Sequence, residues 1–540
     1  MTPFAWNNPY PWPRKPVLAQ NIVSTSQPLA AQAGLQMLAE GGSAVDAILA
    51  TAITLTLVEP VSNGIGSDAY AIVWDGRRLH GLNASGRSPA LWTSEFFAGR
   101  KSMPVRGWNA VSVPGCVSAW VELHARFGKL PFERLFQSAI GYGREGFLVS
   151  PTIAGQWAAQ VPELKSQPGF AQAFMPEGRA PKAGERFRFP AHADALQKIC
   201  ESKGKSFYAG ELAERLEAAA KRGEGGLRAS DMAAHRADWV APLQIGYRGY
   251  ALHELPPNGQ GIVALMALGM LEGFDLRSHP VDGPDSLHLQ IEAMKLAFAD
   301  ARRYIADIDH MDVRPGELLD REYLKSRARL IDVKRAQDFG HGSPPKGGTV
   351  YLTAADASGM MVSFIQSNYL GFGSGVVVEG VSLQNRGGTF VVQPGHPNCV
   401  GPSKRPYQTI IPGFVTREGK PVMSFGVMGG TMQPQGHAQV MVRIADYGQS
   451  PQAASDGPRF RVVQGLDVSA EDGFPAATLA ALQARGHRIV TIDDYNQFGA
   501  AQLIWKLDGG YFVASDPRRD GQPVMSFGVM GGTMQPQGHA

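Results

Sequence analysis

GSPPKGGTVYLTAADASGMMVSFIQS, residues 342–367, decides the fold, because a loop rich in glycine and proline turns into a β-hairpin within it. Apolar residues alternate over 350–354, as expected of a strand. Residues 356–359, with the sequence Asp-Ala-Ser-Gly, have the composition of a hairpin turn, and 361–367 complete a second strand. Thr349 therefore stands where an exposed loop ends and a strand begins.

Thr349 in this position is a candidate nucleophile. A threonine hydroxyl is weak at its ordinary pKa and needs a base. If the chain is cut before Thr349, its new α-amino group, with a reference pKa of about 8, can take the hydroxyl proton. The same hydroxyl can first attack the carbonyl of Gly348 to give an ester that water opens, and Gly347 and Gly348 permit the strained backbone this requires. An isolated Gly-Gly-Thr is more often only the start of a strand, so this motif needs support from the rest of the chain.

Gly429 and Gly430 are candidate oxyanion donors. They follow the apolar run 422–428 and precede a predicted helix. Two glycines at a strand-to-helix turn can present bare N–H groups at a helix N-terminus, which is where an acyl-transfer site needs donors. A plain tight turn is the alternative interpretation.

Outward from the hairpin, the pattern predicts helices before it and strands after it. A helix is expected over 28–40, and a second, buried one begins at Ser43, with Asp46 as its capping partner. The segment from about 110 to 310 reads as mostly helical, and 284–304 is its clearest helix. Strands dominate from 349 to about 430, and a mixed αβ tail follows.

The composition excludes several classes of function. The chain has 540 residues, of which 44% are hydrophobic and 18% charged, and its net charge is +3 without any basic block. Nucleic acid and membranes are therefore not expected partners. The three cysteines form no metal or disulfide pattern, and no metal-binding motif is present, so neither a metal nor another cofactor is expected. The N-terminus lacks the pattern of a signal peptide, which favours the cytoplasm.

An identical repeat of 18 residues occurs at 421–438 and again at 523–540. Structural repeats diverge and come in at least three copies, so this pair indicates a recent duplication or a sequence-assembly artefact. Only one copy can fill a given place in a core. The second is therefore predicted to be peripheral and poorly ordered.

Several long motifs in order resemble the γ-glutamyltransferase family, over about residues 24–521. The matching stretches are PLAAQAGLQMLAEGGSAVDAILATAITLTLVEPVSNGIG (28–66), VPG (113–115), LPPNGQG (255–261), EAMKLAFADAR (292–302), TVYLTAADASG (349–359), GPSKRP (401–406), MGG (428–430) and SDPRRDG (515–521).

The resemblance implies an α+β fold, a four-layer αββα sandwich of the N-terminal-nucleophile hydrolases. It implies self-cleavage between Gly348 and Thr349 into a large subunit, 1–348, and a small subunit, 349–540, with 522–540 as the duplicated tail. The two subunits would stay together and act on a small-molecule amide. Whether two such heterodimers associate stays open.

The same resemblance assigns site residues. Thr349 falls on the catalytic threonine, Gly429 and Gly430 on the oxyanion glycines, and Asn368 on an asparagine of the substrate site. Gln366 stands where the family has a threonine.

The sequence departs from the family mainly at the residues that bind the γ-glutamyl group in the family. Ser85 replaces the arginine for the α-carboxylate, and Arg87 lies two residues later. The positions that read the α-amino group hold Arg386 and Thr389, and a serine pair is replaced by Gln408 and Thr409. Thr389 stands in place of the aspartate, so the anion that a buried ammonium needs nearby is lost, and the arginine at 386 would repel the ammonium. We therefore expect a different acyl group, with Arg87 and Arg386 together holding a carboxylate, as in a dicarboxylic monoamide.

Three functions remain open from the sequence: an amidohydrolase or acyltransferase with such an acyl group, a true γ-glutamyltransferase or glutathione hydrolase with rearranged contacts, and an uncleaved, inactive binding homologue. Either arginine also has a purely structural or solvated interpretation.

Overall fold

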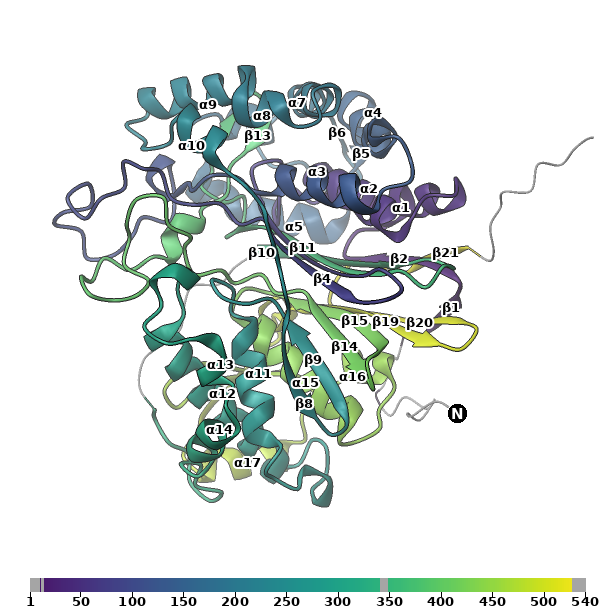
Figure 1. The fold of residues 1–540 in the computed structure, drawn as a ribbon, viewed down its shortest axis with the longest axis vertical. Helices are drawn as coiled ribbons and strands as arrows, with labels where there is room; N and C mark the ends of the chain where they lie inside the picture. The colour runs from purple at the N-terminus through teal and green to yellow at the C-terminus, as the bar shows by residue number, and fades with distance from the viewer. Residues whose placement is uncertain (1–9, 11–13, 340–347, 527–540) are drawn as a thin grey trace, which may run out of the picture.

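Two seven-stranded antiparallel sheets lie face to face, and helices cover the outer face of each (Figure 1). This computed structural model describes residue 10, residues 14–339 and residues 348–526. The four layers run helices, sheet, sheet, helices, so the predicted αββα sandwich is confirmed.

The sheet that contains the hairpin is called sheet I, and the other is sheet II. In spatial order, sheet I consists of β21 (Val524–Ser526), β2 (Asn21–Thr25), β10 (Gly348–Ala355), β11 (Met361–Tyr369), β3 (Asp68–Trp74), β4 (Leu79–Asn83) and β7 (Asp238–Val240). Sheet II consists of β1 (Val17–Ala19), β20 (Gly510–Ser515), β19 (Ala500–Leu507), β15 (Lys420–Met428), β14 (Gly413–Arg417), β9 (Tyr250–Glu254) and β8 (Leu243–Tyr247).

The helices divide between the two outer layers. Those over sheet I are α1 (Pro28–Ala39), α2 (Ala44–Val58), α3 (Cys116–Phe127), α4 (Gln137–Glu145), α5 (Pro151–Leu164), α7 (Pro190–Glu201), α8 (Lys205–Ala209), α9 (Glu211–Arg222) and α10 (Ala229–Ala234). Those under sheet II are α11 (Gly261–Leu271), α12 (Pro284–Tyr304), α13 (Pro315–Leu318), α14 (Arg321–Ala328), α15 (Met432–Ala445), α16 (Pro451–Asp456) and α17 (Ala476–Ala484). Within the described part of the chain, no helix is both long and apolar enough to cross a bilayer.

Helix α2 shows why the N-terminal helices form as predicted. Ser43 and Asp46 make a capping box, in which the Ser43 N–H donates to the Asp46 carboxylate at 2.8 Å. All fifteen residues of α2 are buried, because the helix lies on the outer face of sheet I and packs against α1, α3 and α4. The predicted boundaries of α12 also match those in the structure.

The segment from 110 to 310 is less helical than its pattern indicates. It contributes three strands to the two large sheets: β7 extends sheet I, while β8 and β9 extend sheet II. These strands are three to five residues long. Two of them pair with strands far away in the sequence, β7 with β4 and β9 with β14, so local periodicity does not reveal these pairings.

The hairpin of β10 and β11 occupies the middle of sheet I, and β10 lies over β15 of sheet II. Thr353 Oγ1 is 2.7 Å from Ser424 Oγ, and the ring of Tyr351 lies against Gly426. A Cβ at Gly426 would stand 2.3 Å from that ring, so this crossing requires glycine. Thr349 stands on the same strand, two residues before Tyr351.

The two copies of the repeat have different places. The first copy forms most of β15 and the start of α15. In the second copy, β21 pairs with β2 at the edge of sheet I, and residues 527–540 lie outside the described part of the chain.

Candidate active site

Thr349 lies at the start of β10 with its side chain almost fully buried, at 3% exposure. Its Oγ1 is 3.1 Å from Ser367 Oγ on the neighbouring strand β11. Ser367 Oγ in turn accepts a hydrogen bond of 2.8 Å from the N–H of Tyr369. Gly348 pairs with Tyr369, and the register shifts between Gly348 and Val350, so the ladder is irregular at Thr349. The hydroxyl is thus held at a fixed point where regular pairing begins.

Gly429 and Gly430 connect β15 to α15. Their φ values of +126° and +60° lie in the region that favours glycine. A Cβ on Gly429 would stand 3.0 Å from the Cα of Gly499. Among the described residues, nothing accepts a hydrogen bond from the N–H groups of these two glycines. Two bare N–H groups at a helix N-terminus are what an oxyanion site requires.

Gln260 ties this turn to a buried polar network. Its Nε2 donates to the carbonyl of Gly430 at 2.8 Å and to the carbonyl of Thr409 at 2.6 Å. Thr409 Oγ1 in turn accepts a hydrogen bond of 2.7 Å from Arg386 Nη1. The position of the glycine turn is therefore linked directly to that of Arg386.

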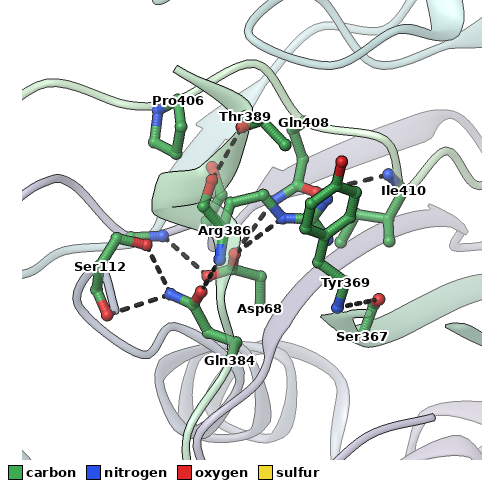
Figure 2. A network of polar contacts seen from close by, with 12 residues as sticks. Asp68, Ser112, Ser367, Tyr369, Gln384, Arg386, Thr389, Pro406, Gln408 and Ile410 are labelled. Atoms are coloured by element: carbon green, nitrogen blue, oxygen red, sulfur yellow. Dashed lines mark hydrogen bonds and ion pairs between the residues drawn. The ribbon is translucent and has the colours of Figure 1, made fainter. Parts of the chain in front are cut away.

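Arg386 is the centre of the network (Figure 2), and its side chain is fully buried. Its guanidinium lies over the ring of Tyr369, 4.6 Å from the ring centroid, and its Nε is 3.6 Å from Asp68 Oδ2. Within the described chain, Nε and Nη2 have no hydrogen-bond acceptor. A buried guanidinium with two unused donors is suited to bind a planar anion such as a carboxylate.

Asp68, at the start of β3, is the charge partner of Arg386. Its carboxylate accepts hydrogen bonds from Gln408 Nε2 and from the Gly86 N–H, both at 3.0 Å. Burial raises the pKa of Asp68 to about 6, although the Arg386 charge opposes this shift. Burial likewise lowers the pKa of Arg386, and Asp68 opposes that shift. Each group thus helps to keep the other charged.

Four of the predicted contact residues meet in this network: Arg386, Thr389, Gln408 and Thr409. Gln408 holds Asp68, and Thr409 holds Arg386. Thr389 Oγ1 lies 2.8 Å from the carbonyl of Arg386 and 2.7 Å from that of Tyr407, so Thr389 fixes the backbone of the short helix 386–389. Its hydroxyl is therefore engaged by the protein itself.

Gln366 and Asn368 lie on the other face of β11 from Ser367, toward the helices over sheet I. Gln366 Oε1 accepts a hydrogen bond of 3.0 Å from Trp120 Nε1 of α3, and its amide donates to Asn63. Asn368 Oδ1 accepts a hydrogen bond of 2.8 Å from Ser67. Because residues alternate between the faces of a strand, both amides support the turn around 62–67 from behind the site.

Arg87 is not brought together with Arg386. Its Nη2 is 3.9 Å from Asp238 Oδ2, and a third of its side chain is exposed. Arg405 binds the same carboxylate at 2.5 Å. The joint carboxylate clamp expected from the sequence is corrected here: Arg386 is in the buried network, whereas Arg87 belongs to a half-exposed ion-pair cluster.

Sequence reasoning missed Asp68, Ser367, Tyr369 and Gln260. The sequence did contain a signal for Asp68, because a carboxylate at the first position of an apolar strand becomes buried and needs a partner. Ser367 is two residues from Ile365, which lies between the sheets, and period-two alternation could have placed it there. Tyr369 has φ of +77°, a strained value for tyrosine that no sequence pattern reveals.

One buried group of possible metal ligands occurs away from this site. His288, Glu292 and His487 have ligand atoms within 4.8 Å of one another. Lys295 Nζ lies among them, 2.7 Å from Glu292 Oε1 and 3.3 Å from His487 Nδ1. An ammonium that bonds two of the three groups fills the place of a cation, so the cluster forms a polar network.

Comparisons with known proteins agree with this geometry. Residues 30–526 match the gamma-glutamyltranspeptidase family. The oxamate amidohydrolase proenzyme of Klebsiella pneumoniae is 36% identical over 511 residues, covering 91% of this chain and 96% of that protein. The glutathione hydrolase-like YwrD proenzyme of Bacillus subtilis is 33% identical over 519 residues, covering 94% and 98%. A crystal structure of cephalosporin acylase from Bacillus halodurans matches with a TM-score of 0.92 at 46% identity, covering 97% of this chain and 99% of that one. With agreement over nearly the whole length in both sequence and fold, this chain belongs to the gamma-glutamyltranspeptidase family and is one of its amide hydrolases.

Proposed function

We propose that the chain cuts itself between Gly348 and Thr349 and then hydrolyses a small amide whose acyl group carries a carboxylate. The products of the cut would be the segments 1–348 and 349–540, held together as one enzyme. The observation that carries this proposal is the unbroken series of contacts from the Thr349 hydroxyl through Ser367 and Tyr369 to Arg386, and from Arg386 through Thr409 and Gln260 to Gly430.

The chemistry follows from these positions. Once freed, the α-amino group of Thr349 takes the proton of its own hydroxyl, which attacks the amide carbonyl. The N–H groups of Gly429 and Gly430 stabilise the oxyanion, and the leaving amine departs with the proton. Water then attacks the acyl-Thr349 ester, which releases the acid and restores the hydroxyl.

The charge of the network favours an anionic acyl group over a γ-glutamyl group. A site that binds a γ-glutamyl group needs an anion to pair with the α-ammonium of that group. In the network of Figure 2, Asp68 is the carboxylate, and it is already bound by Gln408 and paired with Arg386. Arg386, in contrast, has two unused donors. Because Arg386 and Thr349 are separated by only Ser367 and Tyr369, the acyl group should be short.

The relatives support this choice. One is called an oxamate amidohydrolase, and oxamate is a small amide that carries a carboxylate. Another is called a glutathione hydrolase-like protein, so the substrate panel below also includes a γ-glutamyl compound.

A denaturing gel with intact-mass measurement of the wild type and of Thr349→Ala tests the self-cleavage. A substrate panel tests specificity, with oxalyl, glutaryl, acetyl and γ-glutamyl anilides compared by kcat/KM. We expect two fragments in the wild type, one in the variant, and fastest turnover of an acidic acyl anilide. Faster turnover of the γ-glutamyl anilide would make the protein a glutathione hydrolase, and an uncut, inactive wild type would make it a binding homologue.

A further inference from the structure

A second feature of the site is a cavity of about 330 Å³ beside the glycine turn at Gly429. Its wall includes Gly429, Gly371 and Ser62, together with Gln156 of α5, so it adjoins the proposed oxyanion position. Residues 494–497 form an exposed rim. The volume lies at the lower end of the range of about 300–1,000 Å³ that is usual for small-ligand pockets.

Arg461, on the strand β16 (Phe460–Gln464), lines this cavity and is 95% buried, since its exposed fraction is 5%. Among the described residues, its side chain has no hydrogen-bond acceptor and no ion-pair partner, and its Nε is buried without one. Burial lowers its pKa, and no neighbouring carboxylate opposes this effect. An isolated buried cation is costly to the fold, so it is expected to have an anionic partner that binds from outside.

Two other charged residues line the cavity, Arg519 and Asp494. Arg519 lies near the carboxylate of Glu59, which acts to keep Arg519 protonated against burial. Asp494 is at the exposed rim, where Asn496 and Gln497 donate to its carboxylate at 2.9 and 3.2 Å. Carboxylates oppose the shift in the pKa of Arg519 but none opposes that of Arg461, so an anion from outside would compensate the Arg461 charge.

Gly429 lines this cavity, whereas Arg386 does not. Arg386 pairs with Asp68 at the start of β3, which lies beyond β11 from β10. The cavity is lined by residues just before β19 and just after β20, and also by Ser62 and by Gly371 just after β11. An amide with its acyl carboxylate on Arg386 and its carbonyl oxygen at the Gly429 N–H would therefore have this cavity beside it for its leaving amine.

We propose that this cavity binds the leaving amine of the substrate, and that Arg461 recognises a carboxylate on that amine. The inference rests on the proposed amidohydrolase function. The substrate class becomes an amide with an acid at both ends: an acidic acyl group on one side and an amino acid or another carboxylate-bearing amine on the other. Hydrolysis adds one water across the amide bond and releases a diacid and this amine.

Binding of the amine alone tests the subsite without need of activity. The probes are 4-aminobenzoate and its neutral analogue 4-aminobenzamide, titrated by calorimetry into the wild type, Arg461→Met and Arg461→Lys. Arg215→Met on the exposed face of α9 is the matched control, because it removes the same charge outside the cavity. Thermal unfolding of each variant checks the fold, and Arg461→Met should fold because it removes an unpaired buried charge.

We expect the wild type and Arg215→Met to prefer the benzoate by roughly 10- to 100-fold, the strength of one charge-assisted contact. Arg461→Met should abolish this preference, and Arg461→Lys should keep part of it. Equal binding of the two probes by the wild type, or a preference that survives in Arg461→Met, would overturn the proposal.

The kinetic counterpart separates this inference from the proposed function. The ratio of kcat/KM for the oxalyl amides of the same two amines should fall toward one in Arg461→Met. If neither amide is hydrolysed, the amidohydrolase proposal fails, while the calorimetry still decides whether Arg461 forms an anion subsite.

Discussion

Replacing Arg386 by methionine should separate acyl recognition from the rest of the reaction. The variant removes the guanidinium whose Nε and Nη2 have no acceptor among the described residues, while an apolar side chain still fills the space over Tyr369. Thr349, Ser367 and the glycine turn are unchanged. The effect should therefore appear only for substrates whose acyl group carries a carboxylate.

The magnitude follows from the two unused donors. Each hydrogen bond to a charged group contributes about 1.5–3 kcal/mol, so two donors give about 3–6 kcal/mol, or roughly 10²- to 10⁴-fold in kcat/KM. The assay compares oxalyl and acetyl anilides in the wild type and in Arg386→Met. The oxalyl anilide should lose this factor, and the acetyl anilide should change far less.

Stability provides an internal control for the same variant. Arg386→Met leaves the Asp68 carboxylate buried without its charge partner, which costs about 3–5 kcal/mol in the free energy of unfolding. Adding Asp68→Asn should recover most of this loss but none of the oxalyl activity. If a folded, self-cleaved Arg386→Met enzyme hydrolyses the oxalyl anilide as fast as the wild type does, Arg386 does not bind the acyl group.

Three further predictions concern the nucleophile, the glycine turn and the pH dependence. Thr349→Ala should remain one polypeptide of 58.0 kDa by mass spectrometry, and a cut variant would exclude Thr349 as the self-cleaving group. Gly429→Ala places a methyl group 3.0 Å from Gly499 at a φ of +126°, so steady-state kinetics should show kcat lower by roughly 10²- to 10³-fold, and an unaffected kcat would remove Gly429 from the oxyanion site. Because burial raises the pKa of Asp68 to about 6, protonation below that value removes the negative charge beside Arg386, so oxalate should inhibit more strongly as the pH falls from 7 to 5. The raised pKa also means that the native state holds this proton more tightly than the unfolded chain, so the Asp68 contribution to stability decreases as the pH rises from about 4 to about 6, and Asp68→Asn should abolish both effects.

Much of the fold was predictable where the signals are local. The capping box of Ser43 and Asp46, the hairpin of β10 and β11, and the bounds of α12 each depend on residues within a few positions of one another. The strands β7, β8 and β9 were not predicted, because they are short, local propensity is weak there, and β7 and β9 pair with strands far away in the sequence.

The site was predictable to a different degree in each of its parts. The resemblance to the family predicted that Arg386, Gln408 and Thr409 belong to the site, and in the structure they lie in one polar network. The same reasoning expected Arg87 to join them. Arg87 lies two residues after the family's arginine position, however, and in an irregular segment this spacing does not fix where the side chain points. Arg87 pairs with Asp238 instead.

The sequence by itself determined which chemistry is available: a threonine after a loop with glycines, a glycine pair between a strand and a helix, and an arginine where the family reads an ammonium. Only the tertiary structure decided which charges are compensated. Asp68 is adjacent to Arg386, whereas Arg461 faces its cavity without a partner among the described residues. The physical reason is that desolvation and pairing depend on what surrounds a charge in space, and those neighbours come from strands hundreds of residues apart in the chain.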